Sequence, residues 1–544
     1  MSNPFRLIGR FGRDKRGNVA VTFVLALLPI MSAIGCAIDY SLATRMKVKL
    51  QSAADAASVA ALSQKSPGFI AAAAMTGNGS VTAAVTDAQN VFDGDVNGIP
   101  GYAGYNISRT ATVTKTGVNL VSNITFSAVV PTLFMKVIGA SYQTITVTGT
   151  SSSSASLPPY LDFYLALDVS SSMGLPSTPA EAVRMQNVNP DNYIQYPTGC
   201  TLACHFSPQS SACTDPPSSG GISGTQGYPT NGYCLGYIIS RVSQAGYASL
   251  LSTTSITNYR KGVRLPTGIV SGLPNSLYAV KGTGPVSGLT GGGLSAATSC
   301  PTDGTDSCIQ LRLDAVGYAL TQLFQTANND EKVTNQFRIG LYPFITNAYA
   351  YFPLTSAING STTNSSTINY AAANLATLLD TNMNANLGSG GTHIDVGLHT
   401  INGLIPTVGD GSSATNTQPY IFLVTDGAQD PQSKGVPNGS WSGSNHAVTL
   451  DNASNSYPSI CTTIKNRGVI ISVLYIPYTT INPVNASFAG DEDDAANNNI
   501  TNIPGSLRTC ASPGFYYTAN TPTDINNALQ AMFNHVLVTA HITN

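Results

Sequence analysis

The chain opens with a long apolar run. From Gly17 to Ile38 it contains no charged residue, and about 20 mostly apolar residues are enough to span a membrane as a helix. Five basic residues precede the run, and three follow Asp39. The excess of positive charge on the N-terminal side predicts a cytoplasmic N-terminus (1–16), a transmembrane helix (17–38) and export of the remainder. A cleaved signal peptide is the alternative, because small residues at 32–35 suit cleavage.

The region after the apolar run predicts a small α+β domain over residues 39–150. Residues 39–62 are rich in Ala and lack Gly and Pro, so we expect the helix to continue beyond the membrane. Residues 63–85 show no clear pattern. Residues 105–150 are rich in Val, Ile and Thr with partial alternation, which is typical of strands. The Ser- and Pro-rich stretch 151–159 is predicted to be a linker.

Residues 160–544 alternate between buried strands and amphipathic helices. Strands are expected at 160–168, 337–344, 419–426 and 469–477, and helices at 311–328, at 395–405 and from Thr521 onwards, where Pro522 and Asp524 suit a helix start. The strands have few polar residues, as strands covered on both faces do. This alternation predicts an α/β domain with a doubly wound, mostly parallel sheet.

The stretch 175–308 interrupts this alternation of strands and helices. It is rich in Gly, Ser, Thr, Pro and Tyr and holds six of the eight cysteines outside the apolar run. A structureless loop of that length is uncommon, so we predict a disulfide-rich insertion.

The eight cysteines fit an oxidising compartment with up to four disulfides. We expect Cys461 to pair with Cys510 and Cys300 with Cys308. The other four are left with three possible connectivities: Cys200, Cys204, Cys213 and Cys234. A zinc site at Cys200, Cys204 and His205 is the weaker alternative, because structural zinc sites favour Cys pairs separated by two residues.

Composition excludes one class of function. Only 10% of residues are charged, against roughly 25% in average soluble proteins, and the net charge is −2. A nucleic-acid-binding protein would carry a strong basic excess. Neutral polar side chains must therefore provide most of the solubility.

A candidate ligand-binding motif begins at the end of the first predicted strand of the α/β domain, 160–168. Asp168, Ser170 and Ser172 form a D-x-S-x-S motif, Thr392 precedes a predicted helix, and Asp426 ends another predicted strand. Carboxylates and hydroxyls are hard oxygen ligands that suit Mg²⁺, Ca²⁺ or Mn²⁺. In open α/β sheets, ligands bind at the carboxyl ends of strands. The sequence therefore predicts a divalent-metal site, and no catalytic residue is assigned.

This residue set resembles the metal-ion-dependent adhesion site of von Willebrand factor A domains. The resemblance implies that Ser170, Ser172 and Thr392 bind the metal directly or through water, that the two aspartates anchor it, and that Mg²⁺ is the first choice. It also implies an open coordination position for an acidic residue of a protein partner. Because the insertion leaves the chain directly after the metal loop, we expect it to roof the metal face.

The words "RGNVAVTFVLALLPI" and "AIDYS…LQSAADAASVAAL", within residues 13–62, and the stretch 129–151 resemble Flp/Tad pilus-assembly proteins of the TadG type. The resemblance implies a non-enzymatic pilus-assembly or adhesion factor, single-pass in the bacterial inner membrane, with its C-terminal domain periplasmic or surface-exposed. A pilus subunit, an assembly protein or a surface ligand would be its partner.

Two other functions stay as alternatives: an exported metal-dependent hydrolase, and a periplasmic scaffold for pilus subunits. Catalytic metal sites usually add a general base and richer His, Asp and Glu ligation, which the motif lacks. An acidic run at 491–494 suggests calcium, although a solvated loop is favoured. Trp441 is a candidate contact residue.

Overall fold

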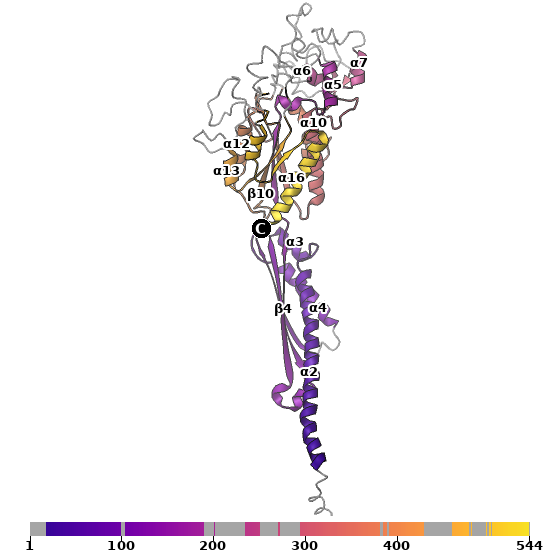
Figure 1. The fold of residues 1–544 in the computed structure, drawn as a ribbon, viewed down its shortest axis with the longest axis vertical. Helices are drawn as coiled ribbons and strands as arrows, with labels where there is room; N and C mark the ends of the chain where they lie inside the picture. Colours follow the sequence, from indigo (N-terminus) through magenta and orange to yellow (C-terminus); the bar gives the residue numbers. More distant parts are fainter. Residues whose placement is uncertain are drawn as a thin grey trace, which may run out of the picture. The chain divides into compact units, whose positions relative to one another are not determined.

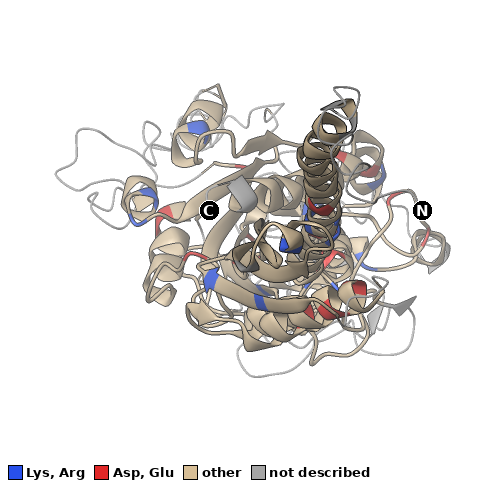
Figure 2. Ribbon diagram, turned by 90° about the horizontal axis from the view of Figure 1, so that it is seen from below, with Lys and Arg blue, Asp and Glu red and all other residues tan. Residues whose placement is uncertain are grey.

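The computed structural model describes residues 18–98, 104–189, 234–250, 294–380, 391–428, 460–477 and 503–542, with short stretches at 201, 270–271, 384–388, 480, 497 and 500–501. The chain divides into two compact units, with the boundary between Pro158 and Pro159. We call them unit 1 and unit 2. Charged residues are sparse along the ribbon (Figure 2).

Unit 1 combines a long helix with a four-stranded antiparallel sheet (Figure 1). The strand order is β1-β2-β3-β4. The strands are β1 (Gly79–Ser80), β2 (Asn106–Thr116), β3 (Asn119–Pro131) and β4 (Thr144–Ser156), and the helices are α2 (Asn18–Ala60), α3 (Pro67–Ala74) and α4 (Thr82–Asn97). Two short 3-10 helices, η3 (Met135–Val137) and η4 (Ala140–Tyr142), connect β3 to β4.

The second half of α2 packs on this sheet. Leu50, Ala54 and Ala57 are fully buried, and their spacing places them on one face of the helix. On β3 every second residue is buried, which is the pattern of a strand with one covered face. The expected helix and small β region are therefore both present.

The predicted linker at 151–159 is wrong for most of its length, because β4 continues to Ser156. Serine has no strong preference for strands, but here the serines find partners. The Ser58 hydroxyl of α2 lies 3.1 Å from that of Ser151 and 2.8 Å from that of Ser153. The backbone of the same residues pairs with β3, so only 157–159 connect the units.

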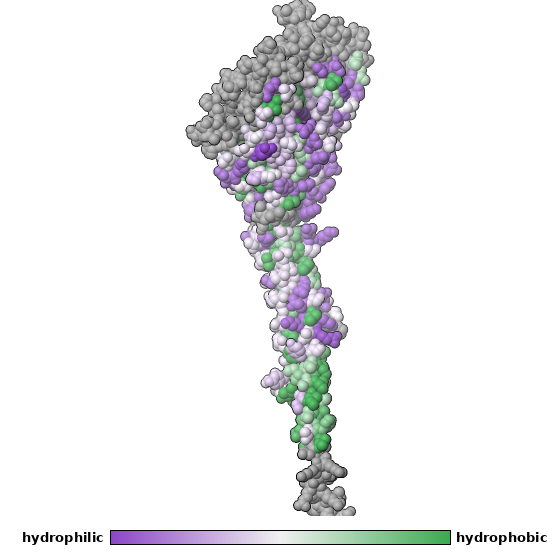
Figure 3. All heavy atoms as spheres, in the orientation of Figure 1, coloured by the Kyte–Doolittle hydropathy of each residue, from purple (hydrophilic) through white to green (hydrophobic). Residues whose placement is uncertain are grey.

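The first half of α2 is the one helix, among the described residues, that is long and apolar enough to cross a membrane by length and composition. In its most apolar window only 6% of the helix is buried inside the protein. Figure 3 shows the corresponding apolar surface around the lower part of α2. This half therefore does not behave as a core helix of unit 1.

Unit 2 is built on a six-stranded sheet in the order β12-β11-β10-β5-β8-β9. The strands are β5 (Leu161–Asp168), β8 (Phe337–Phe344), β9 (Phe352–Thr355), β10 (Gln418–Thr425), β11 (Ile470–Tyr475) and β12 (Tyr516–Thr518). All neighbours pair in parallel except β8 and β9, which pair antiparallel. The four longer strands lie where the sequence predicts them, to within two residues at each end.

Helices cover both faces of this sheet. On β5, Phe163 and Leu165 enter one apolar core, whereas Tyr164 and Ala166 enter another. The first core includes α10 (Arg312–Asp330), α11 (Ile368–Ala373), η6 (Leu375–Leu378) and α16 (Pro522–Ile542), and the second includes α12 (Ile394–Leu404), α13 (Ile460–Asn466) and α15 (Ile503–Cys510). Burial on both sides explains why β5 is buried at every position.

The insertion contributes α5 (Pro179–Val188), α6 (Cys234–Ser240), α7 (Gln244–Leu250), β6 (Val270–Ser271) and β7 (Leu294–Ser295). A 3-10 turn, η5 (Ser171–Gly174), precedes it. The disulfides Cys300–Cys308 and Cys461–Cys510 are present as predicted. The pairing of the other four cysteines, the zinc alternative, Trp441 and the acidic run at 491–494 lie outside the described residues or side chains.

Candidate metal site

Two neighbouring strands bring the predicted aspartates to one edge of the sheet. Asp168 is the last residue of β5, and Asp426 follows directly after β10. The register pairs Leu167 with Val424, so the carboxyl ends of the two strands lie level. Residues that are more than 250 positions apart in the chain therefore meet at the same edge.

Asp168 is 1% exposed and is held by hydrogen bonds to both carboxylate oxygens. Oδ1 accepts from the Ser170 backbone N–H at 3.0 Å and from the Ser170 hydroxyl at 2.5 Å. Oδ2 accepts from the Thr425 hydroxyl at 2.6 Å. The Ser170 and Ser172 hydroxyl oxygens lie 3.3 Å apart. The D-x-S-x-S motif thus forms a compact group of oxygen atoms.

Asp426 is fully buried and joins the same group. Its carboxylate accepts a hydrogen bond from the Ser172 hydroxyl, and Oδ1 accepts one from the Ala428 backbone N–H at 3.4 Å. Its Oδ2 accepts none among the described residues. The next residue, Gly427, has φ 76°, a left-handed conformation that glycine adopts without strain. This turn lets the chain leave β10 sharply at the aspartate.

Asp168 and Asp426 cannot both be ionised at low cost, because both carboxyl groups are buried. Burial raises the pKa of Asp168, and the charge of Asp426 raises it further, against hydrogen bonds from Ser170 and Thr425 that lower it. Burial also raises the pKa of Asp426, although Arg312 and Ser172 partly offset the effect. A buried carboxylate stays ionised only with compensating positive charge or donors. The site is therefore short of positive charge.

One cationic side chain already reaches the site. The Arg312 guanidinium, at the first turn of α10, places Nη1 3.7 Å from Asp426 Oδ2, and its Nη2 donates to the Pro477 carbonyl oxygen at 3.2 Å. Arg312 is 8% exposed. Neither Arg312 nor Thr425 was predicted from the sequence to belong to the site. For Arg312 the available signal was an arginine between two leucines at the start of an amphipathic helix, since buried arginines are almost always paired.

Thr392 is 7% exposed and lies two residues before α12. The next backbone N–H, that of His393, donates to the Ile345 carbonyl oxygen at 2.8 Å, directly after β8. Strand β8 is the neighbour of β5 on the side opposite β10. The structure thus ties the Thr392 segment to the strand beside Asp168.

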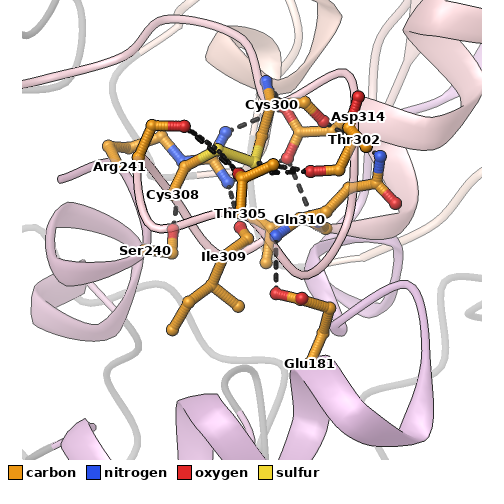
Figure 4. Close-up of a disulfide and its surroundings, with 12 residues drawn as sticks. Glu181, Ser240, Arg241, Cys300, Thr302, Thr305, Cys308, Ile309, Gln310 and Asp314 are labelled. Carbon is orange, nitrogen blue, oxygen red and sulfur yellow. Dashed lines mark hydrogen bonds and ion pairs between the residues drawn. A yellow bond between two sulfur atoms is a disulfide. The ribbon is translucent and has the colours of Figure 1, made fainter. Parts of the chain in front are cut away.

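A buried ion pair fixes the insertion to the first turn of α10 (Figure 4). Arg241 of the insertion and Asp314 of α10 are both fully buried, with Nη2 2.8 Å from Oδ2. Asp314 also accepts from the backbone N–H groups of Cys300 and Leu311. The Cys300–Cys308 disulfide closes the intervening loop. These contacts set the start of α10 and therefore the position of Arg312.

A second acidic side chain secures the same loop. Glu181 of α5 is fully buried and accepts from the backbone N–H groups of Gly304 and Gln310. Arg184 donates to Glu181 Oε1 at 2.6 Å. Both ends of the insertion are thus tied together close to the sheet edge. Whether the rest of the insertion roofs the metal face depends on residues outside those described.

The residues at this edge fit a hard divalent cation. Two buried carboxylates, two adjacent hydroxyls and a carboxylate oxygen without a hydrogen bond form a donor set of oxygen atoms alone. No cluster of three or more His, Cys, Asp or Glu side chains suited to a metal occurs in the described part of the chain. The candidate site instead depends on hydroxyl oxygens, as the motif predicts.

Comparison with known proteins agrees with the N-terminal resemblance. Residues 17–74 match the family model described as "Putative Flp pilus-assembly TadE/G-like". This segment covers all of α2 and all of α3. The resemblance to Tad pilus-assembly proteins is therefore confirmed for this part of the chain. No match was found among curated proteins.

Several solved structures are similar over part or most of the chain. The vWF domain of the type V pili tip protein Mfa5 from Porphyromonas gingivalis is 15% identical, with 43% of this chain and 89% of that chain covered and a TM-score of 0.24. The pilus adhesin SpaC from Lactobacillus rhamnosus GG is 15% identical, with 42% and 28% covered and a TM-score of 0.28. The PilB minor pilin from Streptococcus sanguinis is 9% identical, with 80% and 79% covered and a TM-score of 0.27. At scores this low, function must be argued from the residues of this chain.

Proposed function

We propose that this chain is a membrane-anchored pilus-assembly or adhesion factor that binds a protein partner through a divalent cation. The observation that carries the proposal is the pair of buried carboxylates, Asp168 and Asp426, at one edge of a sheet, with two hydroxyls beside them. The Tad-family match of residues 17–74 supports the pilus context and the anchor.

The cation would be Mg²⁺ first, with Ca²⁺ or Mn²⁺ as alternatives. Ser170, Ser172 and Thr392 would supply neutral oxygen ligands, and the two aspartates would supply the negative charge. When bound, the cation would offer a positive centre to which an acidic residue of the partner can attach. Thr425 would keep Asp168 oriented through its hydrogen bond, and Gly427 would let the chain turn away from the site.

We also assign unit 2 to the doubly wound, von Willebrand factor A-like class. Its support is the strand order, in which β5 is central and its two neighbours, β8 and β10, both run parallel to it. Helices on both faces and one antiparallel edge strand fit the same assignment. The site then lies at the carboxyl ends of the central strands, where open α/β sheets bind ligands.

The proposed topology keeps residues 1–16 in the cytoplasm and both units on the far side of the membrane. Two disulfides support an oxidising location for unit 2, and the charge difference across the apolar run supports the orientation. The partner would be a pilus subunit, an assembly protein or a surface ligand.

The test is metal binding by full-length protein carrying Asp168→Asn or Asp426→Asn. Asparagine keeps the shape but removes the charge, so we expect Mn²⁺ binding, followed by electron paramagnetic resonance, to be lost in both variants. Capture of pilus components should fall with it and should also fall on chelation. Asp162→Asn is the matched control, because Asp162 is buried at the opposite end of β5 and pairs with Arg338. Undiminished Mn²⁺ binding in both site variants would reject the proposal.

A further inference from the structure

The connection between β3 and β4, residues 133–142, exposes an unusual set of apolar side chains. We call this segment the tip. Val137 is 83% exposed and Leu133 58%. Phe134, Ile138 and Tyr142 are about half exposed. Single exposed apolar residues are ordinary, but a contiguous group marks a contact surface.

Hydrogen bonds hold the tip to α2 at one position along the helix, that of Asp39. The Asp39 carboxylate accepts hydrogen bonds from the backbone N–H groups of Leu133 and Phe134 at 2.8 Å and of Met135 at 2.6 Å. Asp39 is 2% exposed and is the first residue after the apolar run of 17–38. The tip therefore lies level with the end of the predicted membrane span, beside α2 (Figure 1).

A second contact reaches into the span itself. A Cβ added to Gly35 would lie 2.5 Å from the Phe134 Cβ, so the glycine is what allows this ring to lie against the helix. The neighbouring turns of α2 carry Met31, Ile34 and Ile38, all exposed. The apolar surface of the tip is thus continuous with that of the span (Figure 3).

We propose that the tip is a second membrane contact, inserted into the headgroup region of the bilayer beside α2. The inference depends on the membrane anchoring proposed above. Its composition suits that depth: apolar side chains face the acyl boundary, while Lys136 and Tyr142 are residue types favoured at the interface. Interfacial segments of this kind bury their apolar face roughly 5–10 Å into the boundary.

A bilayer explains these exposures better than a partner protein does, because the apolar side chains adjoin helix positions that the same bilayer would cover. The tip is closed at its base, where Thr132 donates its hydroxyl to the Tyr142 carbonyl oxygen at 2.6 Å and its N–H to that of Gln143 at 2.9 Å. It can therefore enter the interface as a preformed unit. Two lipid contacts fix the tilt of unit 1, which a single helix leaves free.

The test uses the full chain in phosphatidylcholine–phosphatidylglycerol vesicles whose acyl chains are brominated, with a single reporter tryptophan. The natural tryptophan is first replaced (Trp441→Phe), and Val137→Trp, Leu28→Trp or Val121→Trp is then introduced. Val121 pairs with Ser154 of β4, at the end of the sheet remote from the tip. Leu28→Trp reports on the anchor, and Val121→Trp reports on the part of unit 1 away from lipid.

We expect Val137→Trp to show blue-shifted emission that brominated lipid quenches, as for Leu28→Trp, while Val121→Trp shows neither change. If Leu28→Trp is quenched and Val137→Trp behaves like Val121→Trp, the tip proposal fails while the anchor stands. A blue shift at position 137 without quenching would mean contact with protein instead of lipid, and it would overturn the proposal. If Leu28→Trp is not quenched, the anchor fails and the tip proposal with it.

Discussion

The Arg312 guanidinium places a positive charge where the proposed cation would bind, so its removal should strengthen metal binding. The change to test is Arg312→Gln. Glutamine keeps an N–H donor for the Pro477 carbonyl oxygen, which Arg312 Nη2 contacts at 3.2 Å, but it carries no charge. The variant therefore removes the ion pair with Asp426 while disturbing the start of α10 as little as possible.

The size of the effect follows from one distance. Nη1 lies 3.7 Å from Asp426 Oδ2, and at an effective dielectric constant of about 20 two unit charges at this separation attract by about 4 kcal/mol. A divalent cation on the same carboxylate competes for that attraction and repels the guanidinium. If binding costs a third to a half of the attraction, about 1.4–2 kcal/mol, the variant should bind the cation about 10–30-fold more tightly.

The assay is a Mn²⁺ titration of detergent-solubilised full-length protein, followed by electron paramagnetic resonance and repeated with Mg²⁺ as competitor. Arg338→Gln is the matched control. It loses the ion pair between Arg338 and Asp162 at the other end of the sheet and should leave the affinity unchanged. Equal or weaker Mn²⁺ binding by a folded Arg312→Gln variant would refute the reasoning, because it would make Arg312 a support of the site and not a competitor.

Two further predictions concern unit 2 and the tip. Arg241→Met should lower the free energy of unfolding by about 3–5 kcal/mol, because it leaves the fully buried Asp314 without its cationic partner. Thermal denaturation measures this loss, and the double variant Arg241→Met/Asp314→Leu should recover most of it. An unchanged melting temperature in the single variant would contradict the argument. At Asp39, burial alone would raise the pKa, but the three backbone donors and Lys136 outweigh it and lower the pKa. The carboxylate therefore stabilises the tip fully above its ordinary pKa of about 4 and loses this effect as the pH falls through the lowered value. Hydrogen-exchange protection of the amides of residues 133–135, corrected for intrinsic rates, should be constant from neutral pH to about 4 and fall below it, whereas a loss already near pH 6 would exclude Asp39 as its source.

Much of unit 2 was predictable because its signals are local. Strand β8 occupies the predicted residues 337–344, since a buried strand reads as a short apolar run between polar segments. The last helix begins where predicted: Asp524 accepts from the Thr521 N–H, and the Thr521 hydroxyl accepts from the Asp524 N–H. Both depend on neighbours only a few residues apart, so no knowledge of the tertiary fold is needed.

The missed elements depend on partners far away in the chain. The serines of 151–156 have no strand preference of their own, and they join β4 because β3 and Ser58 lie beside them. Helices α3 and α4 contain several alanines. Because alanine is common on both buried and exposed faces, their sequences do not show one clearly apolar helix face.

At the site, the D-x-S-x-S motif indicated the oxygen donors, but Thr425 and Arg312 could be assigned only once β10 was known to lie beside β5. Sequence alone does not fix that order, because the two strands are separated by the insertion, by α10 and by β8. Side chains that reach across between elements are therefore the part of a site that a motif search leaves out.

The two ends of the insertion have a consequence for how this protein can change. The chain departs and returns through a short antiparallel bridge, in which Ser177 N–H donates to the Gln310 carbonyl oxygen at 2.9 Å and Arg312 N–H to that of Leu175 at 2.8 Å. The insertion therefore leaves the domain and returns to it at two adjacent points. Segments of different length and sequence could be exchanged between the fixed parts of the insertion, which are Glu181, Arg241 and the Cys300–Cys308 disulfide, while the sheet keeps its register. This offers a route to new specificity and a graft point for engineering.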